Sequence, residues 1–437
     1  MSITKENRLL AAVLCVIAIY GMADMASRYI WAYWGVLGGG PDRIGYMAAA
    51  DHVFSRLADI WRTPVYPMIM KVTQVVCGAW WQSALMTLQW ALLIVSAAYL
   101  WRICRMMGVR MAVTAAATLL YGLSPCVNEY CHCMLAEPWS LAVMIFLIYH
   151  ILRFNRERVW RYAVAASALL VVLTFLKPVF VFMIPIMAVV WGYMVWRSRQ
   201  GRSPACVALV VTMAVGGAGW LYSGAVKDLL GVRTMTLATI SNANIIMGIN
   251  SVWQPSEITD PEVKALWQRV VADNGFDPND GTFDTTTGYR MVEAAIAADI
   301  LPEYYSQMQQ CSSRHRALML RAYLHNAAAY CTNSMAASGE ASAYRRVAEA
   351  VSLPLWPALL IVVAYAVAVA AAMVRRRRLM GEHLLLVAVP LSMALITIVG
   401  SMDDYGRLMA PAYPCIAVIA ARGVSTLMQS RRPAEHD

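Results

Sequence analysis

Ionisable side chains recur beside the apolar segments of this 437-residue chain, and five of them could act together. Asp42 and Arg62 lie in residues 38–67, which follow the first apolar segment. The other three, each beside a later apolar segment, are Glu137, Lys177 and Arg407. Arginine and lysine suit a lipid phosphate. A carboxylate near them can act as a general base on an acceptor hydroxyl or amine. Together they predict group transfer from a lipid-phosphate donor, with the cations stabilising the leaving phosphate.

The composition indicates that membrane-spanning helices position these residues. The chain is 60% hydrophobic and only 14% charged, whereas about a quarter of the residues of a soluble protein are charged. Its net charge of +10 is spread over short basic clusters, as topology signals are. No stretch of interleaved basic and aromatic residues indicates a nucleic-acid partner. Leu9–Ala23 lacks a small-residue cleavage site, so we interpret it as a first anchor.

Alternating basic loops predict ten spans with both termini in the cytoplasm. Lys5 and Arg8 precede the first span, and Arg375–Arg378 is the strongest later cytoplasmic signal. The predicted spans are Leu9–Ala23, Ser83–Trp101, Ala112–Ser124, Pro138–Leu152, Tyr162–Leu176, Val179–Trp196, Ala205–Tyr222, Trp356–Val374, Leu384–Val399 and Leu408–Met428. On this topology the five candidate residues all lie on the outer side.

Two outer segments are predicted to be helical without spanning. The first outer loop, 27–82, carries an amphipathic helix over Ile44–Ile60 and a second shallow segment over Val65–Trp81. The long loop 223–353 has the composition of a soluble segment. In it Thr259 or Asp260 should cap a helix that ends at Asn274–Gly275.

Further helix and turns are expected in the same loop. Pro302–Met335 should be a long helical stretch broken near Cys311–Ser313, and Asp277–Asp284 should form turns. The chain therefore divides into a catalytic membrane module (1–222), an outer helical domain (223–353) and C-terminal spans (354–437).

Each candidate residue also has a simpler interpretation. Arg62 and Arg407 could only extend to lipid head groups, and Lys177 could be a plain interface anchor. Glu137 before Pro138 could cap a helix. Asp51 and Asp59 fit the wet face of the interfacial helix.

A metal or a disulfide would also be compatible with parts of the outer side. The triplet Cys131–Cys133, with its central His132, does not match zinc spacing, but outer cysteines could form a disulfide. Asp403 and Asp404 could hold a divalent ion. No other cofactor is indicated.

Four motifs, in their order and shared sidedness, resemble the multi-span GT-C glycosyltransferases. This group includes protein O-mannosyltransferases and the lipid A aminoarabinose transferase. The motifs are Asp42-Arg-Ile-Gly-Tyr46 followed by Arg62-Thr-Pro-Val-Tyr-Pro67, Met134-Leu-Ala-Glu-Pro138, Thr174-Phe-Leu-Lys-Pro178, and Tyr405-Gly-Arg-Leu-Met-Ala-Pro-Ala-Tyr-Pro414. Two positions depart from the pattern, since many members have Glu at Arg43 and Pro at Thr63.

The resemblance implies an inverting enzyme that transfers a hexosyl or pentosyl group from a polyprenyl-phosphate sugar. Asp42 matches the general base, with Glu137 a second candidate for that role. Arg62, Lys177 and Arg407 match ligands of the lipid phosphate. Tyr46 and Tyr66 match substrate contacts.

The setting that we expect is the extracytoplasmic face of a prokaryotic inner (plasma) membrane. The acceptor, which could be a lipid, glycan or protein, is left open. Two other classes also stay open. A transporter or flippase would need mid-span charges, broken helices and repeated halves. A polysaccharide polymerase or ligase would share the substrates without the first-loop acid.

Overall fold

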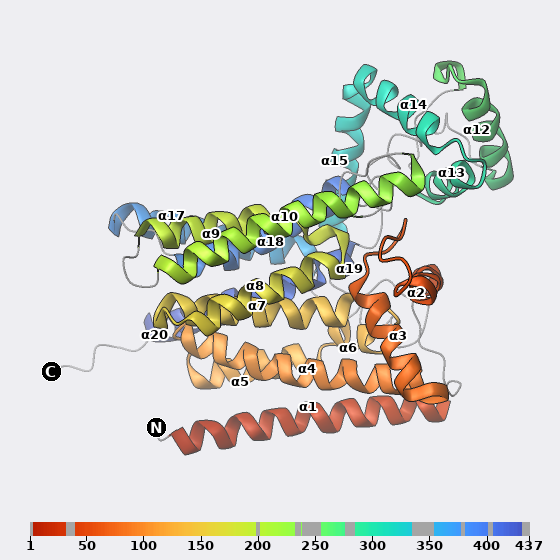
Figure 1. The fold of residues 1–437 in the computed structure, drawn as a ribbon. Coiled ribbons are helices and arrows are strands. Elements are labelled where there is room, and N and C mark those ends of the chain that lie inside the picture. The colour runs from red at the N-terminus through yellow and green to blue at the C-terminus, as the bar shows by residue number, and fades with distance from the viewer. Residues whose placement is uncertain are drawn as a thin grey trace.

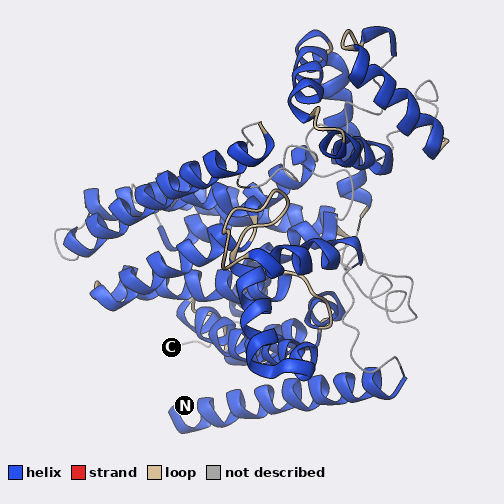
Figure 2. Ribbon diagram, turned by 45° about the vertical axis from the view of Figure 1, so that its right-hand side comes forward, coloured by secondary structure: helices blue, strands red, loops and turns tan. Residues whose placement is uncertain are grey.

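The computed structural model is an all-α polytopic membrane protein, as predicted. It describes residues 3–31, 40–197, 202–231, 237, 255–275, 285–333, 354–376, 381–400 and 405–430. Helices joined by short loops make up this part of the chain, and it contains no strand (Figure 2). The α-helices are α1 (Ile3–Trp31), α2 (Gly40–His52), α3 (Val65–Cys77), α4 (Trp81–Met106), α5 (Met111–Leu123), α6 (Pro125–Cys131), α7 (Glu137–Glu157), α8 (Trp160–Leu176), α9 (Met183–Arg197), α10 (Arg202–Leu230), α12 (Pro261–Asn274), α13 (Thr285–Ala297), α14 (Leu301–Arg314), α15 (Arg316–Thr332), α17 (Leu355–Arg376), α18 (Gly381–Gly400), α19 (Tyr405–Met409) and α20 (Tyr413–Ser430). The 3₁₀ turns are η1 (Gly78–Trp80), η2 (Pro178–Phe182), η3 (Pro255–Glu257) and η4 (Ala410–Ala412).

Apolar helices coincide in position with the ten predicted spans. Seven described stretches are long and apolar enough to cross a membrane: Lys5–Ala26, Val65–Met106, Glu137–Glu157, Pro178–Trp196, Arg202–Leu229, Leu355–Arg375 and Tyr405–Gln429. The other three are shorter apolar helices, Met111–Leu123, Trp160–Leu176 and His383–Val399. A positive φ of 52° at Gly78 separates α3 from α4, so the long second stretch is two helices.

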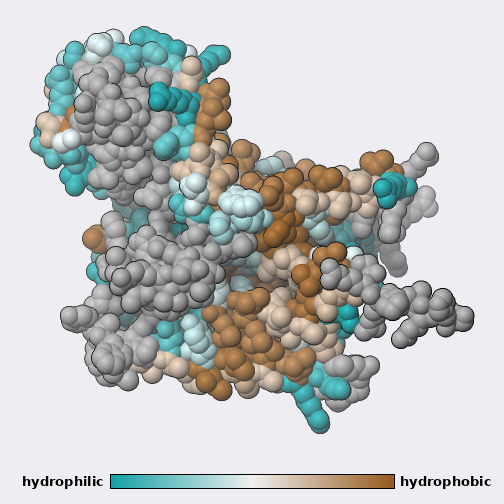
Figure 3. Space-filling model, turned by 180° about the vertical axis from the view of Figure 1, so that it is seen from behind, coloured by the Kyte–Doolittle hydropathy of each residue, from teal (hydrophilic) through white to brown (hydrophobic). Residues whose placement is uncertain are grey.

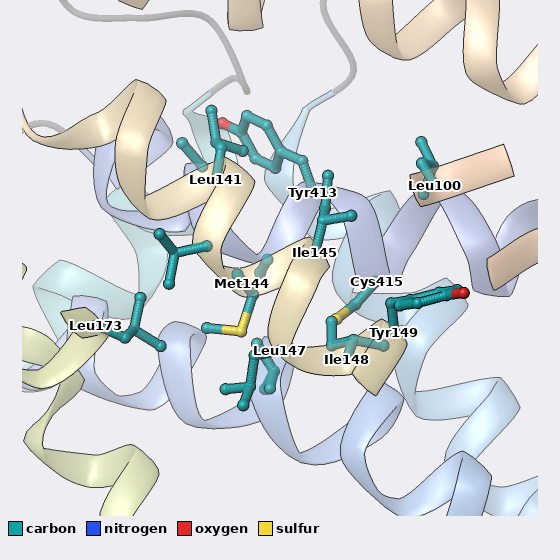
Figure 4. Packing of buried hydrophobic residues seen from close by; sticks show 14 of the residues in the cluster. Leu100, Leu141, Met144, Ile145, Leu147, Ile148, Tyr149, Leu173, Tyr413 and Cys415 are labelled. Carbon is teal, nitrogen blue, oxygen red and sulfur yellow. The ribbon is translucent and has the colours of Figure 1, made fainter. Parts of the chain in front are cut away.

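The helix α7 lies at the centre of the bundle. Within its span 78% of the residues are buried, against 17% for the spans of α1 and α17. Figure 4 shows Met144 and Ile148 of α7 among side chains of α4, α8 and α20, such as Leu100, Leu173 and Cys415. Close packing on all sides makes α7 a rigid support for the groups at its ends.

The two ends of the bundle differ in what they carry. In Figure 1, α1 begins and α20 ends at one end, while α2, α3 and α12–α15 lie toward the other. Figure 3 shows hydrophobic surface over much of the bundle and mainly hydrophilic surface at the far corner where α12–α15 lie. This arrangement agrees with a shared side for both termini and an opposite side for the helical loop.

The helices α12, α13 and α14 have a hydrophobic core of their own. Its buried side chains include Val263, Trp267, Met291 and Tyr304, and Trp61 of the first outer loop packs against them. Satellite cores of this kind form where amphipathic helices bury one face together.

The predicted boundaries in this loop are largely confirmed. The Asp260 carboxylate caps α12 by accepting from the N–H groups of Glu262 and Val263 at 3.0 Å each. Gly275 ends that helix with a φ of 62°. The expected break in the later helical stretch falls at His315, between α14 and α15, a little beyond the predicted position. Asp277–Asp284 lies outside the described residues.

The predicted helix over Ile44–Ile60 is wrong at both ends, since α2 covers Gly40–His52. Beyond His52 its carbonyl accepts from the N–H groups of Ser55 and Arg56, which closes a turn. The Asp59 carboxylate then accepts from the N–H groups of Trp61 and Arg62. Such local bonds offer the backbone an alternative to the helix, which the apolar spacing did not reveal.

Candidate functional site

Five charged side chains from four separate parts of the chain form one alternating series, here called the ion cluster: Arg62, Asp42, Arg407, Glu137 and Lys177. Arg62 Nη2 donates to Asp42 Oδ1 at 2.5 Å. Arg407 joins the two carboxylates, because its Nη2 donates to Asp42 Oδ2 and its Nε donates to Glu137 Oε1 at 2.6 Å. Lys177 Nζ donates to the same Glu137 oxygen at 2.7 Å. The convergence expected of these five residues is therefore present.

The helix α2 positions the outer carboxylate and shapes the space beside it. Asp42 lies in its first turn, where the helix dipole favours a negative charge. Tyr46, one turn later, lies under the Arg62 guanidinium at 4.5 Å from ring centroid to Cζ. A Cβ at Gly45 would lie 2.9 Å from Arg62 Nε, so glycine there leaves the guanidinium room to take this position.

The loop after α2 fixes the backbone of Arg62. Asp59 Oδ1 accepts from the N–H groups of Trp61 at 2.8 Å and Arg62 at 2.7 Å. The Tyr222 hydroxyl of α10 lies 3.2 Å from the Leu57 carbonyl, 3.2 Å from the Arg62 carbonyl and 3.3 Å from the Asp59 nitrogen. The loop is therefore tied both to itself and to the membrane bundle.

The inner residues of the cluster come from helix ends. Glu137 is the first residue of α7, with Pro138 in the first turn, so its charge also sits at a helix N-terminus. Lys177 lies between α8 and η2 with φ −151° and ψ 134°. The following Pro178 favours that extended conformation. Arg407 belongs to the short helix α19, whose Gly406 carbonyl accepts from the Tyr413 hydroxyl at 2.5 Å.

The two carboxylates of the cluster differ in exposure. The side chain of Glu137 is fully buried and that of Asp42 is 20% exposed. Burial opposes ionisation of Asp42, but the guanidinium groups of Arg407 and Arg62 outweigh it and hold the pKa of Asp42 well below its usual range. Asp42 is thus an ionised carboxylate and the more accessible of the two.

The two tyrosines predicted to contact substrate are buried behind Arg62. Tyr46 and Tyr66 meet edge to face with ring centroids 4.8 Å apart. The Tyr66 hydroxyl donates to Gln89 Oε1 at 3.3 Å, and the Gln89 amide donates to the Cys131 carbonyl at 2.8 Å. Burial also raises the pKa of Tyr46. Tyr46 thus supports the arginine and Tyr66 packs against Tyr46, while substrate contact by either tyrosine stays a prediction.

Other ionisable groups singled out in the sequence lie elsewhere. Asp51 is 77% exposed and lies 3.7 Å from Lys71. Asp59 closes the loop described above. His132 Nε2 lies 2.6 Å from Asp24 Oδ2, which ties the outer end of α1 to the loop before α7.

Two of the outer cysteines considered for a metal or a disulfide make hydrogen bonds to backbone carbonyls. The thiol of Cys133 donates to the Glu129 carbonyl at 3.4 Å, and that of Cys131 donates to the Gln89 carbonyl at 3.9 Å. Within the described ranges no group of three or more His, Cys, Asp or Glu side chains could hold a metal ion. Asp403 and Asp404 lie outside those ranges.

The supports of Arg62 were not found by reasoning from the sequence. Three residues contact Arg62 only because of how the chain folds: Gly45 leaves space beside its guanidinium, Asp59 accepts from its N–H group, and the Tyr222 hydroxyl donates to its carbonyl. An Asp two and three residues before N–H groups that need acceptors is a recognisable turn signal. Nothing in the local sequence connects Tyr222 to a loop about 160 residues away.

Comparison with known proteins gives a fold relationship. No family model and no curated protein sequence matches the chain. Two structures of the oligosaccharyltransferase AglB from Archaeoglobus fulgidus match it. The complex with an inhibitory peptide and a dolichol-phosphate has a TM-score of 0.50 and 12% identity over 100% of this chain and 53% of that one. The apo form has a TM-score of 0.52 and 13% identity over 97% and 51%.

These comparisons establish a similarity of fold. AglB is a GT-C superfamily enzyme, so the predicted GT-C-like fold is confirmed. The chain spans about half the length of the oligosaccharyltransferases that it matches. At 12–13% identity the comparison shows the fold alone.

Proposed function

We propose that this protein is a membrane glycosyltransferase that moves a sugar from a polyprenyl-phosphate donor to an acceptor, with inversion at the sugar carbon. The observation that carries the proposal is the ion cluster, in which three cations and two carboxylates meet in a largely buried place. The GT-C-like fold supports it, since one of the structures with a similar fold is a complex with a dolichol-phosphate.

The net charge of the cluster suits a lipid monophosphate. Three cations and two carboxylates leave a charge of +1. A sugar phosphodiester donor carries one negative charge, and the released phosphate monoester carries close to two at neutral pH. If Asp42 takes up the acceptor proton, the cluster gains one positive charge as the phosphate gains its negative charge. The site then stays near neutrality throughout, which avoids an unpaired buried charge.

Asp42 would be the general base of this reaction. The acceptor oxygen or nitrogen forms a bond to the sugar carbon, the bond from that carbon to the phosphate oxygen breaks, and the acceptor proton passes to Asp42. The electron pair of the broken bond stays on the phosphate. Arg62, Arg407 and Lys177 would stabilise that developing charge, since preorganised cations in a dry site act strongly on a leaving group.

Among the described residues, the ion cluster has one accessible carboxylate, Asp42, which supports inversion over retention. A double displacement uses a nucleophile together with an acid/base group, as retaining glycosidases do. Glu137, the cluster's other carboxylate, is fully buried under two cations and is poorly placed for either task. A single displacement assisted by Asp42 therefore fits the arrangement best.

The reaction would take place at the extracytoplasmic face of an inner (plasma) membrane. The helices α2 and α19, which carry Asp42 and Arg407, lie toward the same end of the bundle as α12–α15 (Figure 1). The sugar, hexosyl or pentosyl, and the acceptor stay open. A divalent ion at Asp403 and Asp404 stays a prediction.

The test is transfer of a labelled sugar from polyprenyl-phosphate donors by purified protein in detergent. Asp42→Asn should lower the turnover by about a hundredfold or more, as loss of a general base does. Asp51→Asn is the matched control, because Asp51 is an exposed acid of the same helix. Wild-type turnover with full activity in Asp42→Asn would contradict Asp42 as the base. Absence of both transfer and polyprenyl-phosphate binding in the wild type would contradict the function and favour the transporter or polymerase alternatives.

A further inference from the structure

The two carboxylates of the ion cluster share their chemistry but differ in their surroundings. Glu137 has no exposed surface, so it cannot touch an acceptor that approaches from outside. Its contacts are instead with two of the cluster's three cations, through Lys177 Nζ at 2.7 Å and Arg407 Nε at 2.6 Å. The sequence alone left Glu137 as a second candidate for the base, and the geometry argues against that role.

Both cations bind the same oxygen of Glu137. Its other oxygen, Oε2, is buried and has no hydrogen-bond partner among the described residues. A buried carboxylate usually fills the acceptor sites of both oxygens, because unfilled buried sites cost stability. Here the arrangement gathers Lys177 and Arg407 on one side of the carboxylate. Their nitrogens are close neighbours, although like charges would otherwise repel each other.

The position of Glu137 at the start of α7 helps to hold Lys177 and Arg407 in place. Glu137 begins α7, the most buried of the candidate spans, and its partners come from the junction after α8 and from α19. One side chain thus joins segments that are 40 and 270 residues away in the chain. The Nη2 atom of Arg407 points on to Asp42, so Glu137 also sets the direction of that guanidinium.

We infer that Glu137 is a positioning residue, which holds Lys177 and Arg407 together as a preformed binding pair for the phosphate of a lipid donor. This inference rests on the proposed function. Supporting partners of this kind typically affect affinity more than their distance from the ligand suggests, since they fix the orientation of the groups that bind.

Simple electrostatics and positioning predict opposite results for one substitution. Glu137→Gln removes a negative charge beside an anion site, so a purely electrostatic role predicts tighter binding of phosphate. A positioning role predicts weaker binding, because two unneutralised buried cations no longer stay side by side. The probe is fluorescently labelled polyprenyl phosphate, and its affinity is measured for purified full-length protein in detergent.

We expect Glu137→Gln to weaken binding of the probe by about tenfold or more. Glu157→Gln is the matched control. It removes a carboxylate at the opposite end of α7 that also meets two arginines, Arg153 and Arg161, and it should change affinity by less than about twofold. Glu137→Asp keeps the charge but withdraws the carboxylate by one methylene. It should recover thermal stability and only part of the affinity.

The possible results distinguish failure of the positioning role from failure of the proposed function. Wild-type binding together with equal or tighter binding by Glu137→Gln would overturn the positioning role and leave the proposed function intact. If Glu137→Gln does not fold, full wild-type affinity in Glu137→Asp would overturn it instead. No binding of the probe by the wild type would contradict the proposed function itself.

Discussion

The inner and outer ends of the ion cluster show how one kind of side chain can be given two tasks. At the inner end, Glu137 starts the central helix α7, is fully buried and binds two cations through one oxygen. At the outer end, Asp42 lies in the first turn of the short helix α2, is 20% exposed and binds two arginines, one through each oxygen. Glu137, which is buried at the start of a central helix, can therefore organise cations, whereas Asp42, which is partly exposed, can be reached by an acceptor.

Each arginine beside Asp42 also contacts a second residue, so its position does not depend on Asp42 alone. Arg62 lies over the Tyr46 ring, and Arg407 is bound to Glu137. Both guanidinium groups should therefore keep their places if Asp42 is removed. Among the described residues, Lys177 forms its ion pair with Glu137. Loss of Glu137 should therefore disturb the cations more than loss of Asp42.

Removal of Arg407 should give the largest effect, because this residue connects the two ends. Arg407→Ala leaves both carboxylates short of a cation, and we expect a loss of about 3 kcal/mol in unfolding free energy. Transfer activity should fall to background. Arg407→Lys, which cannot serve both carboxylates at once, should recover part of the stability and little activity. Thermal unfolding in detergent and a transfer assay measure the two. Wild-type stability in Arg407→Ala would show that the cluster is not a structural link.

The pH dependence of the unfolding free energy in acid should reveal the contribution of Asp42. The folded-state pKa of Asp42 lies below the unfolded value of about 3.9. Its stabilising contribution is therefore fully present above the unfolded pKa and is lost as the pH falls through the folded pKa. Asp42→Asn lacks this contribution at every pH.

The measurement compares unfolding of the wild type and Asp42→Asn between pH 7 and the acid limit of the protein. The difference in stability should be constant down to about pH 5 and should shrink at lower pH. A difference that changes between pH 6 and pH 8 would mean that another group titrates with Asp42.

A smaller effect is expected when the space beside Arg62 is filled by the substitution Gly45→Ala. Gly45→Ala would put a Cβ 2.9 Å from Arg62 Nε and 3.1 Å from its Nη2, so the guanidinium must shift while the backbone need not. We expect a folded protein with several-fold weaker binding of polyprenyl phosphate. Gly192→Ala is the matched control, since no described atom lies within 4 Å of the added Cβ. Equal affinity in both variants would mean that the position of Arg62 matters little.

The smallest effect on the cluster should come from the helical part of the long outer loop. Asp260→Ala removes two N-cap hydrogen bonds of α12 and should cost about 1 kcal/mol locally. Hydrogen exchange should speed up in α12 while polyprenyl-phosphate affinity stays unchanged. Weaker phosphate binding in this variant would indicate that α12 supports the site through the packing of Trp61 on its core.

Much of the fold could be predicted because its signals are local. Apolar runs and basic clusters located the ten apolar helices, and Asp260, Pro261 and Gly275 marked the ends of α12. The convergence of Asp42, Arg62, Glu137, Lys177 and Arg407 could be expected because charges at the ends of spans on one side must find partners. The end of α2 was missed because hydrogen bonds made by Asp59 compete with a helix that the apolar spacing favours.

The division of tasks between the carboxylates could not be predicted from the sequence. Glu137 and Asp42 both stand near helix N-termini, and their neighbours in the chain do not show which one is buried. That difference depends on how α7 packs among α4, α8 and α20 and on the position of α19, which contacts distant in sequence decide.

The most direct test of the two roles is the affinity of Asp42→Asn for labelled polyprenyl phosphate, measured beside Glu137→Gln. We predict that Asp42→Asn binds at least as tightly as the wild type, because both arginines keep their second supports and lose a competing anion. Glu137→Gln should bind more weakly. Equal losses of affinity in the two variants would contradict the account, since the two carboxylates would then have the same task.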